Sequence, residues 1–91
     1  MGDSKITIDD SEMSPKMRQD AVLCVTTAIG LYSDYTEIAT YIRDTFDDMH
    51  GKYWQCIVGN FGQRIWKTST YYIRFKWGDN WILLFKAPDS S

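Results

Sequence analysis

The hydrophobic repeat of this 91-residue chain changes its period at Gly51. Before that glycine, apolar residues recur every three or four positions, which is typical of helices with one buried face. After it they recur every second position, which is typical of half-buried strands. The sequence therefore predicts an α+β fold in which two helices pack on one face of an antiparallel sheet.

Both predicted helices carry capping signals at their starts. Ser14 is placed to accept a backbone N–H as N-cap, and Pro15 fits the first helical position, so the first helix is expected over about residues 15–31. Ser33-Asp34 offers a second cap, and the apolar period that follows continues to about residue 49, where Gly51 ends the helix. Because the link between them is very short, the two helices are expected to pack as an antiparallel pair.

Five strands are predicted around these helices. A short edge strand over residues 5–9 precedes them, and strands at 54–59, 61 to about 67, 71–77 and 81–85 follow, which gives the order β-α-α-β-β-β-β. The last strand is apolar on both faces and should be central, with a hairpin turn at residues 78–80 before it. Residues 1–91 are expected to form one domain with flexible ends at 1–4 and 88–91.

Two helices can cover only one of the two faces of such a sheet. A core of this size is also marginal for a subunit that stands alone, and a partner subunit would stabilise it. A second copy of the sheet is the simplest cover for the remaining face. The sequence therefore favours a homodimer.

The charges of the chain divide at the same point as the hydrophobic period. Residues 1–50 hold four bases and ten acids, a net charge of −6, whereas residues 51–91 hold six bases and two acids, a net charge of +4. A partner that docks on the strands would therefore meet a positive field. No apolar run is long enough to span a bilayer and no signal segment opens the chain, so an intracellular, soluble protein is expected.

The sequence contains no catalytic or metal-binding constellation that we can identify. His50 is the only histidine and is expected to be a solvated residue in the last helical turn. Cys24 and Cys56 fall on apolar faces and are expected to be packed free thiols. Three acids late in the second helix read as a solvated face, since calcium sites need a loop: Asp44, Asp47 and Asp48. We therefore expect a protein that is not an enzyme and has no cofactor.

Over about residues 5–86 the chain resembles the small cytoplasmic dynein light chains. The resemblance is carried by Trp54-Gln55-Cys56-Ile57-Val58-Gly59 with Asn60-Phe61-Gly62, by Met13-Ser14 with Met17 and Asp20, by Phe46, and by Ile82-Leu83-Leu84-Phe85-Lys86. It implies a homodimer in which the short strand after Gly62 crosses to the sheet of the other subunit. It also implies an adaptor of the dynein motor complex, in the cytoplasm and on the microtubule cytoskeleton.

The resemblance further implies two grooves at the dimer interface, where extended client segments add as strands. The implied partners are the dynein intermediate chain and other extended-peptide clients. The crossing strand and groove edge would be Asn60, Phe61, Gly62, Gln63, Arg64, Ile65, Trp66 and Lys67, and the groove floor Tyr72, Arg74, Lys76, Trp81 and Leu83. The dimer interface would include Trp54, Gln55, Phe61, Arg64, Ile65 and Trp66.

Several positions depart from the family pattern. Tyr35-Thr36 replaces an acidic-basic pair that reads a client glutamine, and one residue is missing between Gly59 and Asn60. Gln55 and Lys67 stand where the family has histidines, so the interface pH switch should be absent. The floor residues Arg74 and Lys76 replace tyrosines, which favours acidic clients. Trp81 replaces a small residue and is expected to fill part of the groove.

Two other functions are consistent with the same residues. A structural or membrane-associated scaffold would keep the dimer and lose client binding, as the changes at Trp81 and Tyr35-Thr36 suggest. A basic aromatic sheet could instead stack single-stranded nucleic acid, through Arg64, Lys67, Arg74 and Lys76 with Trp66, Tyr72 and Trp81. The acidic net charge argues against nucleic acid, so peptide binding is preferred.

Overall fold

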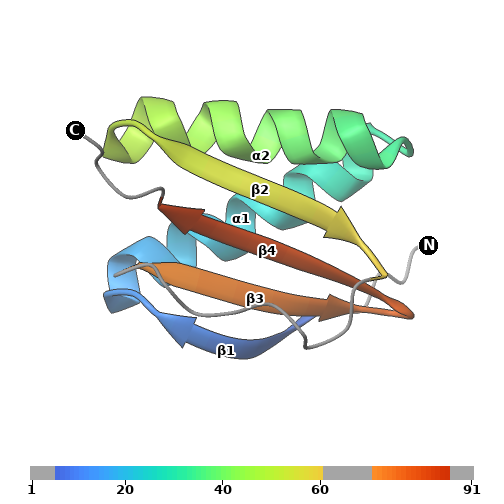
Figure 1. Ribbon diagram of the computed structural model, residues 1–91, viewed down its shortest axis with the longest axis horizontal. Coiled ribbons are helices and arrows are strands. Elements are labelled where there is room, and N and C mark those ends of the chain that lie inside the picture. Colours follow the sequence, from blue (N-terminus) through green and yellow to red (C-terminus); the bar gives the residue numbers. More distant parts are fainter. Residues whose placement is uncertain (1–5, 61–70, 87–91) are drawn as a thin grey trace.

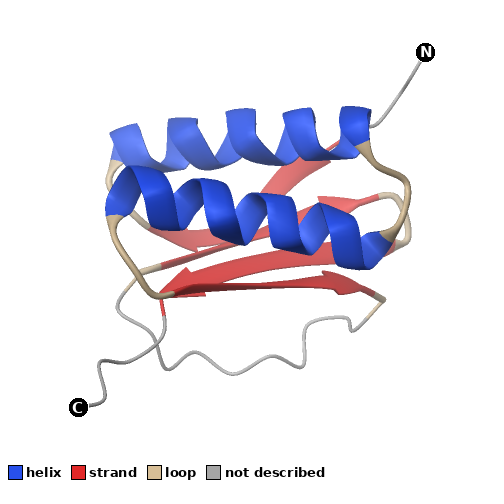
Figure 2. Cartoon of the chain, turned by 90° about the horizontal axis from the view of Figure 1, so that it is seen from above, coloured by secondary structure: helices blue, strands red, loops and turns tan. Residues whose placement is uncertain are grey.

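The computed structural model describes residues 6–60 and 71–86. It contains two helices, α1 (Pro15–Leu31) and α2 (Tyr35–His50), and four strands, β1 (Ile6–Glu12), β2 (Trp54–Gly59), β3 (Tyr72–Trp77) and β4 (Asn80–Lys86). Both helices lie on the same face of one antiparallel sheet (Figures 1 and 2), which confirms the predicted α+β fold. The predicted strand at 61 to about 67 and the ends predicted to be flexible, 1–4 and 88–91, lie outside the described residues.

The helices begin and end where the sequence predicts. The hydroxyl of Ser14 accepts a hydrogen bond from the Met17 backbone N–H at 3.2 Å, and the carboxylate of Asp34 accepts one from the Glu37 N–H at 3.1 Å. Gly51 follows α2 with a φ of 83°, a left-handed conformation that a glycine adopts without strain. These caps are local, which is why the sequence alone locates them.

The strand order in the sheet is β1-β3-β4-β2. β4 pairs with both β2 and β3, as predicted for a central strand, while β1 pairs with β3 alone among the described strands. β1 extends three residues beyond the predicted end at Asp9, because it is anchored to β3 by side chains as well as backbone. The hydroxyl of Tyr72 donates to the Asp10 carboxylate at 3.0 Å, which holds a segment of poor strand formers in the sheet.

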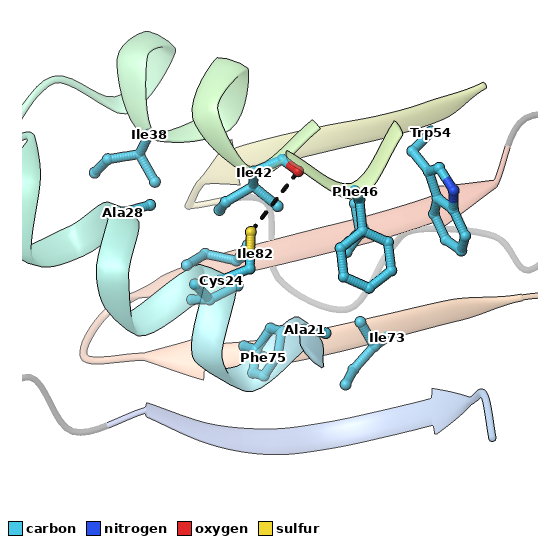
Figure 3. Close-up of a cluster of buried hydrophobic side chains, with 12 residues drawn as sticks. Ala21, Cys24, Ala28, Ile38, Ile42, Phe46, Trp54, Ile73, Phe75 and Ile82 are labelled. Atoms are coloured by element: carbon cyan, nitrogen blue, oxygen red, sulfur yellow. Dashed lines mark hydrogen bonds between the residues drawn. The ribbon is translucent and has the colours of Figure 1, made fainter. Parts of the chain in front are cut away.

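The hydrophobic core fills the space between the helices and the sheet (Figure 3). Phe46 of α2 and Trp54 of β2 pack edge to face, with ring centroids 4.8 Å apart. The face of α1 that meets them is built largely from small residues, which allows this helix to approach the sheet closely. The fully buried members of the core are Ala21, Val25, Ala28, Ile38, Ile42, Phe46, Ile73, Phe75, Ile82 and Leu84.

Asp47 joins the end of α2 to the start of β2. Its carboxylate accepts a hydrogen bond from the Trp54 backbone N–H at 2.8 Å. The sequence prediction that Asp47 belongs to a solvated face is therefore wrong, whereas Asp44 and Asp48 are exposed as expected. This contact also explains why an acid stands near the C-terminal end of a helix, where the helix dipole disfavours negative charge.

We expect the Asp47→Ala substitution to lower the free energy of unfolding by about 1–3 kcal/mol, because it leaves the N–H of Trp54 without its charged acceptor. Denaturant unfolding monitored by circular dichroism measures this change. The matched control is Asp48→Ala, which removes an exposed acid from the same turn and should change stability by less than about 0.5 kcal/mol. Equal losses in the two variants would show that the bond to Trp54 contributes nothing.

Candidate functional site

The five predicted floor residues lie together on the sheet face that the helices leave uncovered. In β3, Ile73 and Phe75 point into the core, so the residues that alternate with them point to the opposite side. The register places Tyr72, Arg74 and Lys76 beside Phe85, Leu83 and Trp81 of β4, which in turn lie beside Gln55, Ile57 and Gly59 of β2. We call this set of residues the outer face.

Trp81 lies beneath two cations on the outer face. The guanidinium carbon of Arg74 is 5.7 Å from the centroid of the indole ring, and the ammonium nitrogen of Lys76 is 5.2 Å from it. Both distances are within the range of cation–π attraction. Trp81 is 9% exposed, so most of its surface is already used within the subunit.

The positive charge of Arg74 is compensated within the subunit. Its Nη2 and Nε atoms donate to the Asp9 carboxylate of β1 at 2.6 and 2.9 Å. Lys76 donates to the carbonyl of Gly78 at 3.0 Å and has no carboxylate partner in the described segments. Lys76 is therefore the residue through which the described part of the floor presents positive charge, and the acids of β1 reduce the field that the strand half was expected to show.

β2 forms the edge of the sheet on the far side from β1. One side of β2 pairs with β4, and no strand among the described residues pairs with the other side. Gln55 and Ile57 of this strand are exposed on the outer face, and Asn60 is exposed just after it. The side chain of Trp54, predicted at a dimer interface, instead lies in the subunit core and is 1% exposed. The remaining predicted groove-edge and interface residues, 61–67, lie outside the described segments.

A hollow of about 270 Å³ separates α2 from the unpaired side of β2. Tyr35 and Thr36 at the start of α2 line one side, together with Ala39, Thr40 and Arg43 further along the helix. Cys56 and Val58 of β2 line the other side. The hollow therefore combines an apolar floor with hydroxyl groups and one guanidinium.

His50 differs from its prediction, because it is paired rather than solvated. Its Nε2 atom is 3.0 Å from a carboxylate oxygen of Asp20, and both side chains are only 18% exposed. The antiparallel packing of the helices brings the last turn of α2 beside the second turn of α1. The hydrophobic repeat of the sequence does not predict this contact. Desolvation alone would raise the pKa of Asp20. Its hydrogen bonds to His50 and Lys16 lower the pKa by more than desolvation raises it, so the net pKa lies below the ordinary value.

Neither cysteine is suited to act as a nucleophile. Burial raises the pKa of the Cys24 thiol to about 11, and burial raises the pKa of Cys56 as well, so both stay protonated near neutral pH. Figure 3 shows Cys24 packed in the core, where its sulfur lies 3.9 Å from the carbonyl oxygen of Ile42. In residues 6–60 and 71–86, no group of three or more His, Cys, Asp or Glu side chains could hold a metal ion, and neither helix could span a membrane.

Comparison with known proteins points to one family. The family model described as dynein light chain type 1 matches residues 5–87. A dynein light chain-like domain from the Fasciola hepatica calcium binding protein FhCaBP2 has a similar structure, with a TM-score of 0.74, 22% sequence identity and 94% of each chain covered. The corresponding domain of CsTAL3 has a TM-score of 0.72 and 16% identity, covering 92% of this chain and 94% of that one. At such identities the two structures establish the fold alone.

We expect the Asp20→Asn substitution to remove a contribution to the free energy of unfolding that depends on pH. A carboxyl whose pKa is lowered by folding stabilises the folded state while it is ionised, and this stability is lost as the pH falls through the folded-state pKa. Unfolding measured across pH should therefore show wild type more stable than the variant at neutral pH, with a difference that starts to close only below the ordinary value of 3.8. The control Asp48→Asn should show no such difference, and a difference that persists in strong acid would contradict the assignment.

Proposed function

The chain belongs to the dynein light chain type 1 family, and from this we propose that it is a non-enzymatic, homodimeric light chain that binds extended client segments by strand addition. The proposed location is the cytoplasm, as a part of the dynein motor complex on microtubules. The dynein intermediate chain is the first client to be considered, and clients unrelated to dynein are the second class.

The unpaired side of β2 is the observation that supports dimer formation best. An edge strand presents N–H and C=O groups that a strand from another chain can satisfy. Ile57, which is 41% exposed, lies on this strand and would be covered by such an addition. The hollow between α2 and β2 offers space for side chains of the added strand. The edge and the hollow together suit strand exchange between two subunits.

The outer face suggests which clients the dimer would prefer. Since Asp9 already compensates Arg74, the charge available to a client is that of Lys76, which would favour one acidic residue at the matching position. The start of α2 presents Tyr35 and Thr36 to the hollow rather than an acidic-basic pair, so recognition of a client glutamine is not expected. We therefore propose a client motif that differs from the usual one of the family.

Trp81 favours a second candidate function. Its ring is held by Arg74 and Lys76 and occupies the floor of the proposed groove. If this arrangement persists in the dimer, the outer face would serve subunit contact alone. The protein would then be a scaffold dimer, structural or membrane-associated, without client binding.

We expect the full chain to sediment as a dimer at micromolar concentration. The Ile57→Asp substitution places a charge beside the unpaired edge of β2 and should weaken the dimer by about 1.4 kcal/mol or more, a tenfold rise in the dissociation constant. The matched control is Ile8→Asp, since Ile8 is also 41% exposed but lies on β1 at the opposite edge of the sheet. A wild-type chain that sediments only as a monomer would overturn the proposal.

The same sedimentation run at mildly acidic pH provides a further control on the interface. Gln55 does not titrate, and the single histidine of the chain, His50, contacts Asp20 on the helix side of the sheet. The dimer should therefore have the same molecular weight at neutral and mildly acidic pH. Dissociation on mild acidification would show that a titrating group controls the interface after all.

Selection of random displayed peptides on the purified dimer tests client binding. The adaptor proposal expects extended peptides with an acidic residue, whose affinity falls about tenfold in the Lys76→Glu variant. The control Lys52→Glu carries the same charge change at an exposed position away from the outer face. If the dimer forms but no peptide is sensitive to Lys76→Glu, the scaffold function is the correct one.

A further inference from the structure

A second groove lies beside Ile8 of β1, on the side of the sheet that faces the helices. It has a volume of about 880 Å³ and lies between β1 and α1. Ile8 forms its strand wall, and its helix wall includes Lys16, Arg18, Val22 and Leu23. Figure 1 shows that β1 is the outermost strand, at the opposite edge of the sheet from β2. The groove shares no residue with the outer face.

Aliphatic side chains stand exposed on both walls of this groove. Ile8 is 41% exposed and Leu23 is 66% exposed, while Val22 between them is half-buried. Large aliphatic side chains that face a common groove are typical of surfaces that bind a partner. A side chain inserted between Ile8 and Leu23 would remove apolar surface of both residues from water.

The backbone of β1 offers a second element of recognition. β1 pairs with β3 along one side, and no described strand pairs with its other side. The register shift between Ile8 and Asp10 leaves Ile6–Ile8 as the regular part before the irregularity. An incoming segment could therefore form a short ladder with residues 6–8 and direct alternate side chains toward α1.

The charges at the groove favour an acidic occupant. The first turn and a half of α1 contains Lys16 and Arg18, and its first turn has no acidic residue. Asp20 also lines the groove, but its carboxylate is shared between Lys16 and His50, whereas Arg18 makes no ion pair in the described segments. The nearby acids of β1 are directed to β3, where Asp9 binds Arg74 and Asp10 binds Tyr72. A carboxylate in the groove would therefore find an uncompensated guanidinium.

We propose that the groove between β1 and α1 is a docking site for an acidic, extended segment of a partner protein. The segment adds as a short strand to residues 6–8, inserts an aliphatic side chain between Ile8 and Leu23, and places a carboxylate at Arg18. The site is independent of the unpaired side of β2 and of the outer face. One dimer could then hold clients on one side of the sheet and a different class of partner at each outer edge.

Random displayed peptides selected on the full chain provide the test. The proposal expects a group of recovered peptides in which acidic and aliphatic residues alternate, and whose affinity falls about tenfold or more in both Leu23→Asp and Arg18→Glu. Leu31→Asp is the matched control for the first variant, because Leu31 is 60% exposed on the same helix but outside the groove. Lys52→Glu is the control for the second, since Lys52 is exposed and lines neither this groove nor the hollow between α2 and β2. Circular dichroism verifies that all four variants fold.

The outcomes separate this groove from the outer face. Peptides of the proposed group keep their affinity in Lys76→Glu, whereas clients of the outer face lose theirs in that variant and keep it in Leu23→Asp. The proposal is overturned if no recovered peptide distinguishes Leu23→Asp from Leu31→Asp. It is also overturned if Leu23→Asp changes the molecular weight of the protein alone, because the occupant would then be a second copy of the chain.

Discussion

A four-stranded sheet has two faces, and the two helices of this chain can cover only one of them. The inner face is filled by a continuous core in which Phe46 and Trp54 pack against each other and aliphatic residues of β3 and β4 lie below them. The proposed binding surfaces lie on what remains: the outer face, and the sides of β2 and β1 that no described strand pairs with. Because burial of apolar surface dominates the stability of a small domain, the sheet face that the helices leave uncovered and the two edges of the sheet are natural sites of association.

The outer face is balanced by charges from a distant part of the chain. Cationic residues on a β-strand would ordinarily repel one another and leave a strong positive field. Here Trp81 attracts Arg74 and Lys76 through its ring, and Asp9 neutralises one of the two. Arg74 is 13% exposed, so a lone guanidinium at this position would carry a substantial desolvation penalty that the carboxylate offsets. The acidic N-terminal half and the basic C-terminal half are therefore complementary within one subunit.

Sequence reasoning located the elements whose signals are local. The caps at Ser14 and Asp34, the glycine at 51 and the alternation in β2 to β4 each lie within a few residues of what they determine. It missed contacts between residues far apart in the sequence, such as those of His50 with Asp20, which are 30 positions apart. Hydrophobic period predicts which face a residue occupies, but it does not predict the partner of a polar side chain. Trp54, placed at the dimer interface by resemblance, is 1% exposed within the single subunit.

The bonds between β1 and β3 also bear on the order in which the protein can form. Asp9 and Arg74 are separated by 65 positions, and the Asp10–Tyr72 contact spans 62. Such contacts close about two thirds of the 91-residue chain into a loop, and contacts of this kind form slowly because the loop-closure entropy must be overcome first. During synthesis β1 leaves the ribosome first, but it cannot pair until β3, near the end of the chain, has also been made. The helices, the β3–β4 hairpin and β2 can assemble before β1 joins, so β1 and its contacts with Arg74 and Tyr72 would be the last described parts of the subunit to become native.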